Sequence, residues 1–480
     1  MNAFLRRLYC AESLVPERRR LGPLPKTGEA YRNIGRIAGP SVAEMVLTSL
    51  IGSIDAMMVG ILGKNAIAGV NLPIQPRMIS LALFFALNVG VTAIVARRKG
   101  EQRREDANMT IRNAIMLAGL LSLAVMALSI LVAEPLMRLA GGNTSTPDDA
   151  IVLRDAVDYY VIISCSLPFH AVSMCINAAM RGVGNTKLTL RVNLVSNLVN
   201  VLFNYLLIGG NLGFPRLEVR GAAIASVIGI VTGAVMAVYA ITRHKDSYLH
   251  IGRRDRWRFH GETMQSIVRL GGNAMIEQIS MRIGFFIYGR IIYSMGVTAF
   301  AAHNITAQMM ALTFNFADGL SVAGTSLVGQ NLGARRSDLS LLYGKMTQRL
   351  ATLISLIIAA GVAIFRYPIA YLFIDRGTAG AGEVIALATA SMLVLACYQP
   401  IQMNAVTLSG ALRGAGDNLY VASVMMVCVS ILRPLMSYIA VYVLHFSLPL
   451  TWAMSLGEML VRALSFGLRF EGGKWMTKKV

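Results

Sequence analysis

The amino-acid sequence predicts an all-α integral membrane protein with twelve transmembrane helices in two six-helix bundles, related by a pseudo-two-fold axis along the membrane normal. Three observations support this fold. The 480 residues are 55% hydrophobic and only 15% charged, and apolar runs of bilayer-spanning length, about 20 residues, recur along the chain. Lys and Arg concentrate in alternate loops between these runs. The second half of the chain also resembles the first.

The first bundle is predicted over residues 36–242. Its six helices are expected at the apolar segments 37–61, 67–95, 112–134, 156–180, 188–210 and 221–242. The preceding segment, 1–35, contains several Arg but no long apolar stretch. We therefore expect a disordered, basic cytoplasmic tail there, and no signal peptide.

The second bundle is predicted over residues 266–468. Its six helices are expected at the apolar segments 266–294, 299–328, 346–373, 383–411, 418–444 and 448–468. A basic segment, 243–265, connects the two bundles, and we interpret it as a solvated cytoplasmic hinge. A cytoplasmic tail, 469–480, completes the chain.

The distribution of Lys and Arg orients the helices. With both termini in the cytoplasm, the inner loops carry 21 Lys and Arg and the outer loops carry 7. This bias predicts an even number of spans with both termini in the cytoplasm. The membrane is expected to be the plasma membrane, the inner membrane of a bacterium. The bias also accounts for the net charge of +20, so nucleic-acid binding is not expected. Five scattered Cys and six His show no metal-ligand spacing, so we expect no cofactor.

An internal repeat relates the two halves. A shift of 233 residues aligns Glu44 with Glu277 and Asn71 with Asn304, and a shift of 232 aligns MRGVGN (180–185) with LRGAGD (412–417). Six spans per half is an even number, so both halves face the same way. Parallel repeats of this kind are typical of transporters that work by alternating access.

Several segments carry a specific resemblance. GPSVAEMVLTSLIGSIDAMMVGILG (39–63), RGVGNTKL (181–188) and the segment 301–336, which contains VGQNLGARR, resemble the multidrug and toxic compound extrusion (MATE) family. The resemblance implies a monomeric secondary antiporter that exports small organic compounds, often cationic drugs or toxic metabolites, in exchange for H⁺ or Na⁺ by rocker-switch alternating access. No phosphate loop GxxxxGK[ST] is present in the sequence.

Asp55 lies in the outer half of the first predicted helix. An ionisable residue inside the membrane is a candidate functional residue. The position matches the aspartate that the resembled transporters use for the coupling ion. A buried carboxylate can take a proton, and with enough oxygen neighbours it can hold Na⁺ as a metal ligand. The alternative is a helix-end carboxylate close to water.

Four Asn in the fifth predicted helix, at 193, 197, 200 and 204, share one helix face because their spacings are 4, 3 and 4. Asn200 and Asn204 match a pair in the resembled family that lies beside the aspartate. They are expected to donate to Asp55 or to offer carbonyl oxygens to Na⁺. The alternative is hydrogen bonding between helices.

Two further residues of the first helix are candidates. Pro40 lies fifteen residues before Asp55, a spacing that the resembled family shows, and predicts a helix bend or the start of the helix. Glu44 shares nearly the same helix face as Asp55, about 16 Å away. It is interpreted as a second acid on an ion path or as the partner of Arg77.

Glu277 is the main acid of the second half and a candidate for ion coupling. The resemblance is approximate here, because relatives often carry the acid one turn later, at the position of Met281. An ion pair of Glu277 with Arg282 or Arg290 is the alternative. Glu458 and Arg462, four residues apart on the last helix, are expected to form a structural pair.

Other functions are less well supported by the sequence. A flippase for a lipid-linked oligosaccharide or lipid, from the same broader superfamily, remains an alternative, although such proteins typically have more spans. An enzyme is not expected, since His170 and His303 have no HExxH or GxSxG setting. A passive channel fits the repeat less well than a transporter does.

Overall fold

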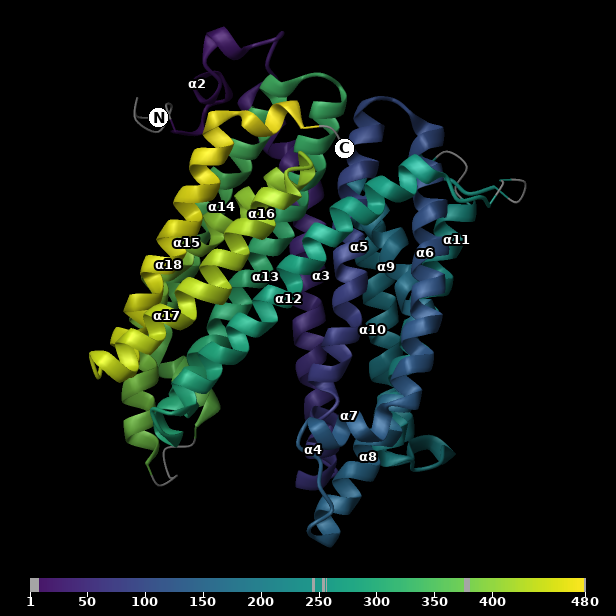
Figure 1. Cartoon of the computed structure of the whole chain (residues 1–480), viewed down its shortest axis with the longest axis vertical. Coiled ribbons are helices and arrows are strands. Elements are labelled where there is room, and N and C mark those ends of the chain that lie inside the picture. Colours follow the sequence, from purple (N-terminus) through teal and green to yellow (C-terminus); the bar gives the residue numbers. More distant parts are fainter. Residues whose placement is uncertain (1–7, 244–246, 253–254, 256, 375–379, 479–480) are drawn as a thin grey trace. The chain divides into compact units, whose positions relative to one another are not determined.

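The computed structural model describes residues 8–243, 247–252, 255, 257–374 and 380–478 (Figure 1). Within them, twelve helical segments correspond one to one to the predicted spans. The first six are α3 (Thr27–Gly60), α4 (Lys64–Asn71) with α5 (Ile74–Gly100), α6 (Arg104–Leu131), α8 (Pro147–Ser164) with α9 (Leu167–Gly182), α10 (Thr186–Gly209) and α11 (Glu218–Arg243). A short helix, α7 (Ala133–Leu139), follows α6.

The second half contains the other six segments. They are α12 (Gly261–Tyr293), α13 (Val297–Gly333), α14 (Ser337–Phe373), α15 (Ala381–Gly414), a composite helix of α16 (Asn418–Met425) and α17 (Arg433–Tyr438), and α18 (Leu448–Gly472). The composite helix includes two π-helical stretches, Met426–Leu432 and Ile439–Val443.

Most of these helices can cross a bilayer. In the described part of the chain, eight spans are long and apolar enough, and the α8–α9 pair, bent by 51°, is a ninth candidate. α12, α13 and α18 are of similar length but more polar. α12 and α18 contain buried acids, Glu277 and Glu458, which lower the mean hydropathy without facing lipid. The all-helical membrane fold is therefore confirmed.

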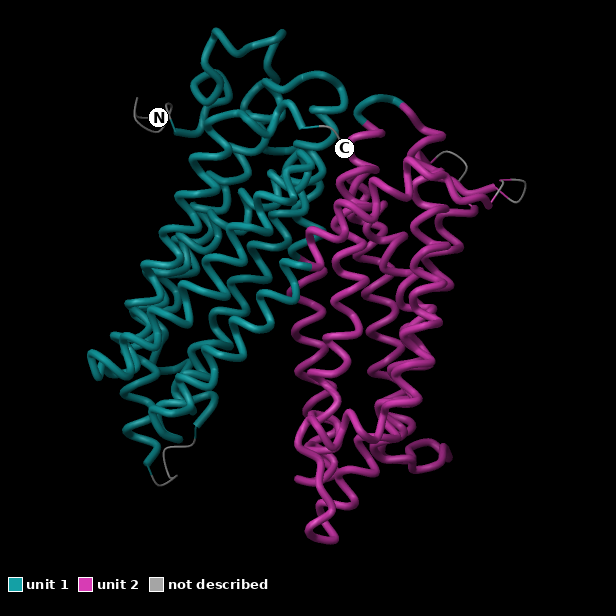
Figure 2. The backbone as a smooth tube through the Cα atoms, in the orientation of Figure 1, with its two compact units in different colours: residues 1–42, 100–102, 276–480 teal, residues 43–99, 103–275 magenta. Residues whose placement is uncertain are grey.

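Internal contacts divide the chain into two compact units (Figure 2). Unit 1 consists of residues 1–42, 100–102 and 276–480, and unit 2 of residues 43–99 and 103–275. The unit limits fall inside α3 and α12, whereas the sequence places the limits of the first bundle at 36 and 242. The predicted limits were placed in loops. The first turns of α12 belong to unit 2 instead, because they pack closely on α5: a Cβ added at Gly90 would lie only 3.2 Å from the Ile267 carbonyl oxygen.

The internal repeat appears in the packing of each unit. In unit 2, α6 packs on α9 and α10 on α11, and the Thr92 hydroxyl donates to the Ala178 carbonyl at 3.0 Å. In unit 1, α13 packs on α14 and α15, and Thr325 donates to the Gly410 carbonyl at 2.8 Å. Thr325 is Thr92 plus 233, and Gly410 is Ala178 plus 232. The same interhelical bond thus occurs once in each unit.

The segment before the first predicted helix is ordered from residue 8, so the expectation of disorder is wrong there. Residues 1–7 lie outside the described residues. The short helix α2 (Ala11–Leu14) buries Leu14, and Val15 is buried beside it against side chains of α13 and α14. The Leu21 amide donates to Asp338 at 3.1 Å. Burial of these apolar side chains, together with the polar contact, stabilises one conformation of the segment.

The connector and the C-terminal tail also differ from expectation. Residues 244–246, 253–254 and 256 of the connector lie outside the described residues, as do 479–480 of the tail. Leu249 and Ile251 are buried, and Arg104 donates to the carbonyls of Ser247 and Tyr248, so this part is not a solvated hinge. In the tail, Trp475 is buried and stacks on a Phe ring at the end of α18.

Candidate functional site

The Asn face of α10 is turned toward α3 within unit 2. The Asn193 amide donates to Glu44 at 2.6 Å, and the Asn197 amide to Thr48 at 3.5 Å. The Asn204 amide donates to Asp55 at 2.8 Å. Each pair is separated by 149 residues, which means that α3 and α10 run parallel in one constant register. The spacing of the Asn residues therefore sets which group of α3 each amide meets.

Asp55 is the acid at the centre of this site. Asn204 is 2% exposed and Asn200 is 7% exposed, whereas Asp55 itself is half-buried. The Asn200 amide, in the orientation in which its oxygen accepts from the Ser226 amide at 3.1 Å, donates to both Asp55 oxygens at 3.1 and 2.9 Å. The carboxylate thus receives N–H groups from two amides, as the sequence predicts, with Ser226 as a supporting residue that sequence reasoning missed.

One polar atom of the site has no partner. The side-chain oxygen of Asn204 is buried and accepts no hydrogen bond from any residue that the structure describes. A buried carbonyl oxygen without a donor costs free energy, and a cation or a proton-bearing group would satisfy it. Carboxylate and amide oxygens are also the ligands that hard cations prefer. Within the described residues no three His, Cys, Asp or Glu come together, so such a site would rely on Asp55 and amide oxygens.

Glu44 is buried in a separate, fully occupied network. Arg181 forms an ion pair with it, Thr189 donates to it at 2.9 Å, and Asn193 donates at 2.6 Å. The predicted alternative partner, Arg77, is not involved. Each carboxylate oxygen already accepts hydrogen bonds, which leaves little capacity for a mobile ion.

Glu277 has the equivalent position in unit 1 and is 2% exposed. It forms an ion pair with Arg413, so the alternative of a pair with Arg282 or Arg290 is wrong. Arg413 corresponds to Arg181 by the shift of 232, and Glu277 corresponds to Glu44 by the shift of 233. The two ion pairs are therefore copies of one another. The repeat contains the acid and the arginine in both halves, and this recurrence in the sequence could have indicated that they pair.

A buried cluster in unit 1 was only partly predicted. Glu458 and Arg462 form the expected pair at 3.2 Å. Arg433 also binds Glu458, at 2.8 Å, and donates to the Tyr398 hydroxyl. All three charged side chains are less than a tenth exposed. Two guanidinium groups therefore share one carboxylate, so the three side chains together carry a net charge of +1.

Pro40 lies well inside α3, thirteen residues after the helix begins at Thr27. The expectation of a helix start at this position is wrong. A proline at an internal position removes one backbone hydrogen bond and allows a bend. Two residues later, between 42 and 43, α3 passes from unit 1 to unit 2.

The fold and its two repeats define a multi-pass membrane protein with the architecture of a secondary transporter. The MatE family model matches residues 40–206 and 274–439. The chain belongs to the MATE family of transporters. The family resemblance that the sequence predicts is therefore confirmed.

Individual relatives cover nearly the whole chain. It is 25% identical over 462 residues to the probable multidrug resistance protein NorM of Thermotoga maritima, covering 95% of this chain and 96% of the relative. Among solved structures, a MOP superfamily transporter from Pyrococcus furiosus gives a TM-score of 0.85 at 21% identity, over 94% and 97% of the two chains. An outward-facing multidrug resistance MATE family transporter gives 0.84 at 21% identity, over 92% and 96%.

Proposed function

We propose that this chain is a secondary antiporter that exports organic, often cationic compounds in exchange for H⁺ or Na⁺. It acts as a monomer by rocker-switch alternating access, in a bacterial inner membrane with both termini in the cytoplasm. Family membership and the names of relatives described as multidrug resistance proteins support this substrate class.

The observation that carries the proposal is the arrangement around Asp55. An amide group offers an N–H on one side and a carbonyl oxygen on the other. In the present arrangement, Asn200 and Asn204 direct N–H groups at the Asp55 carboxylate, which stabilises its charge. A bound H⁺ or Na⁺ cancels that charge, and rotated amides then offer oxygens. The same three side chains can therefore solvate both states of the site.

The change in charge is coupled to the first helix. Asp55 and Pro40 are both on α3, and Pro40 lies where the helix can bend. Binding or release of the cation alters the hydrogen bonds between α3 and α10. It therefore changes the relative free energies of α3 conformations that make these hydrogen bonds and conformations that do not. Glu44 and Glu277 are assigned to the framework, because each is held by an arginine.

Transport in everted vesicles with ethidium as the reporter tests the proposal. An imposed proton gradient and an imposed Na⁺ gradient are compared for the wild type and Asp55→Asn, with Glu134→Gln as the matched control. Glu134 forms only an exposed pair with Arg138, so its variant should transport normally. One gradient should drive the wild type, and Asp55→Asn should be folded but at least about tenfold slower.

Two outcomes would contradict the proposal. If Asp55→Asn transports ethidium as fast as the wild type under the same gradient, the carboxylate is structural. If neither gradient moves ethidium, while a lipid-linked oligosaccharide is translocated by the reconstituted wild type, the flippase alternative replaces the antiporter.

A further inference from the structure

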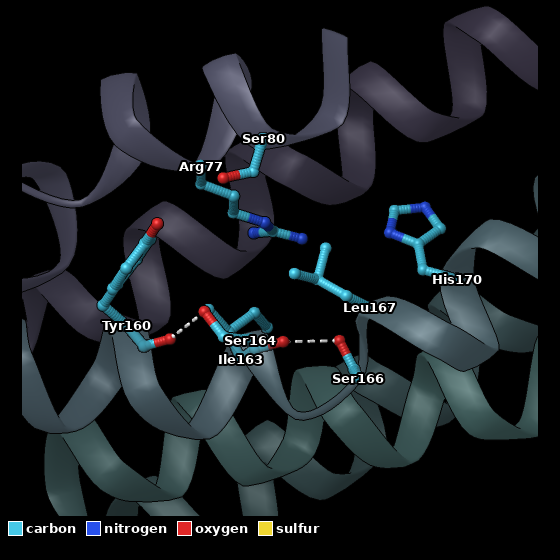
Figure 3. A pocket seen from close by; sticks show the side chains of 8 residues that line it. All are labelled: Arg77, Ser80, Tyr160, Ile163, Ser164, Ser166, Leu167 and His170. Carbon is cyan, nitrogen blue, oxygen red and sulfur yellow. Dashed lines mark hydrogen bonds between the residues drawn. The ribbon is translucent and has the colours of Figure 1, made fainter. Parts of the chain in front are cut away.

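Arg77 and Arg282 are intramembrane arginines that form no ion pair with any residue that the structure describes. Arg77 lies in a small pocket of unit 2 that is also lined by Ser80, Tyr160 and His170 (Figure 3). This pocket has room for about one water molecule, so it holds no larger ligand. Arg282 of α12 differs, because it lies exposed on the surface of unit 1.

Arg282 lies near the middle of the bilayer. α12 ends at Tyr293, a residue type common at membrane interfaces, eleven residues after Arg282. Eleven helical residues are about 16 Å long, which is about half the thickness of the hydrocarbon core. Arg290 is three residues from that end and can extend its side chain to the headgroup region, whereas Arg282 cannot.

A different face of α12 fits the lipid. Four isoleucines, each between 40% and 53% exposed, form one stripe along the helix because their spacings are 3, 4 and 4. They are Ile276, Ile279, Ile283 and Ile287. Arg282 lies about 100° around the helix from the centre of this stripe. A charged residue at this depth faces the protein interior or water rather than lipid, so the exposed face around Arg282 borders a water-filled space.

Aromatic and polar side chains surround Arg282. Phe285 and Phe286 follow it by three and four residues, and Gln278 precedes it by four, so all three lie beside it on the helix surface. Phe286 is 72% exposed and Phe285 is 38% exposed. A guanidinium next to exposed rings can bind a charged group while the rings contact a planar apolar one.

This face of unit 1 is positively charged. The guanidinium carbon of Arg433, in the buried cluster with a net charge of +1, lies 5.3 Å from the centre of the Phe285 ring. Glu277, the acid nearest to Arg282 along α12, is buried and bound by Arg413. Positive charges that no acid balances favour an anionic ligand and disfavour a purely cationic one.

The internal repeat shows that the fold does not require an arginine here. The shift of 233 places Ser49 at the position of Arg282 and Ser53 at that of Phe286. Both serines are exposed on α3, and both are small and uncharged. Arg282 also makes no hydrogen bond with any residue that the structure describes, so packing of unit 1 does not explain it. Binding of a ligand does.

We propose that Arg282 binds an anionic group of the transported compound, such as a carboxylate, and that Phe285 and Phe286 contact its planar apolar part. The planar fork of an arginine fits the two oxygens of a carboxylate. This inference rests on the proposed transport function and narrows its substrate class. Compounds that carry a carboxylate beside a cationic group are preferred over compounds that carry the cation alone.

The test uses a matched pair of fluorescent dyes, rhodamine B and its ethyl ester. Both have the same cationic ring system, but only rhodamine B carries a free carboxylate. Fluorescence anisotropy measures the binding of each dye to the full chain, purified in neutral detergent, as wild type, Arg282→Gln, Arg282→Ser and Arg290→Gln. Arg290→Gln is the matched control, since it removes the same charge from the same helix near the membrane surface.

The wild type and Arg290→Gln should bind rhodamine B about tenfold more tightly than the ester, and both Arg282 variants should lose this preference. Arg282 has no partner that its replacement would strand, so the variants should fold, and either folded variant decides. The proposal is overturned if the wild type shows no preference or binds neither dye, if a folded Arg282 variant keeps the preference, or if Arg290→Gln loses it equally.

Failure of this inference and failure of the proposed function give different results. Ion-driven ethidium transport by a wild type that does not prefer rhodamine B refutes the anionic site alone. A preference for rhodamine B that depends on Arg282, in a protein that moves ethidium under neither gradient, supports the anionic site and refutes the proposed coupling.

Discussion

Replacement of Arg413 by Gln should destabilise the protein more than replacement of Arg181 by Gln. The two arginines hold repeat-related acids, Glu277 and Glu44, and are similarly exposed, with side chains 20% and 25% accessible. Both acids are 3% accessible at the side chain. The two substitutions therefore remove the same charge from the same kind of place, and differ only in what remains around the acid.

The remaining neighbours set the size of the difference. Removing one partner of a buried ion pair costs about 3–5 kcal/mol, since the other charge is left uncompensated. In Arg181→Gln, Glu44 keeps donors from Thr189 at 2.9 Å and Asn193 at 2.6 Å. In Arg413→Gln, Glu277 keeps no other donor among the described residues. A hydrogen bond to a charged group contributes about 1.5–3 kcal/mol. The single proton of the Thr189 hydroxyl is also within 2.8 Å of the Thr186 carbonyl, so only the Asn193 bond is counted in full, and we expect Arg413→Gln to cost about 1.5–3 kcal/mol more.

Reversible unfolding in mixed micelles, with increasing SDS, measures this difference. A gap of about 2 kcal/mol is a roughly 30-fold difference in the unfolding equilibrium. Double-mutant cycles with Glu277→Gln and Glu44→Gln separate the pair energy from the effect of each side chain alone. An equal cost for both substitutions, or a larger cost for Arg181→Gln, would refute the argument that the neutral donors compensate.

Three further substitutions test the site and the packing. Asn204→Leu removes a donor to the site carboxylate and should slow transport about tenfold, whereas Asn197→Leu, at the weaker 3.5 Å contact, should change vesicle transport less than about twofold. Gly414→Ala places a Cβ against a carbonyl of α13 and should cost about 1–3 kcal/mol in unfolding, whereas Gly467→Ala meets no atom within 4 Å and should be neutral or stabilising. Val15→Asp buries a charge in the ordered N-terminal segment and should lower the thermal midpoint, unless that segment is detached from α13 and α14.

The sequence predicted the order and approximate place of the spans better than their ends. α3 begins at Thr27 rather than at 37, and α14 begins at Ser337 rather than at 346. Hydropathy detects the turns that face lipid or the core, while turns beyond the bilayer are polar and leave no apolar signal. At α14 those turns are fixed instead by polar contacts, such as the pair of Arg336 and Asp338 at 2.9 Å.

Partners of charged residues were harder to predict than the residues themselves. Asp55, Asn200 and Asn204 come together as expected, since the Asn spacing defines a helix face. The arginines considered as alternative partners of Glu44 and Glu277 are not the ones that bind them, because spacing along one helix does not say which residues of another helix lie opposite. The repeat relates helices far apart in sequence, and it is the information that was needed.

The repeat also shows where the two halves differ. The shift of 233 places Tyr288 at the position of Asp55, and the shift of 232 places Glu458 at the position of Ser226. At these positions, unit 2 therefore has an acid, Asp55, on its first helix with neutral donors around it, while unit 1 has an acid, Glu458, on its last helix, where Arg433 and Arg462 bind it.

A cation in unit 1 would have to displace a guanidinium, whereas a cation at Asp55 would compete with no charged group. If Asp55 is the coupling residue, each transport cycle then exchanges one coupling charge at one site. Glu458→Gln should lower stability, because it strands two buried guanidinium groups. It should leave the ion selectivity of the remaining transport unchanged, and an altered selectivity would place a second coupling site in unit 1.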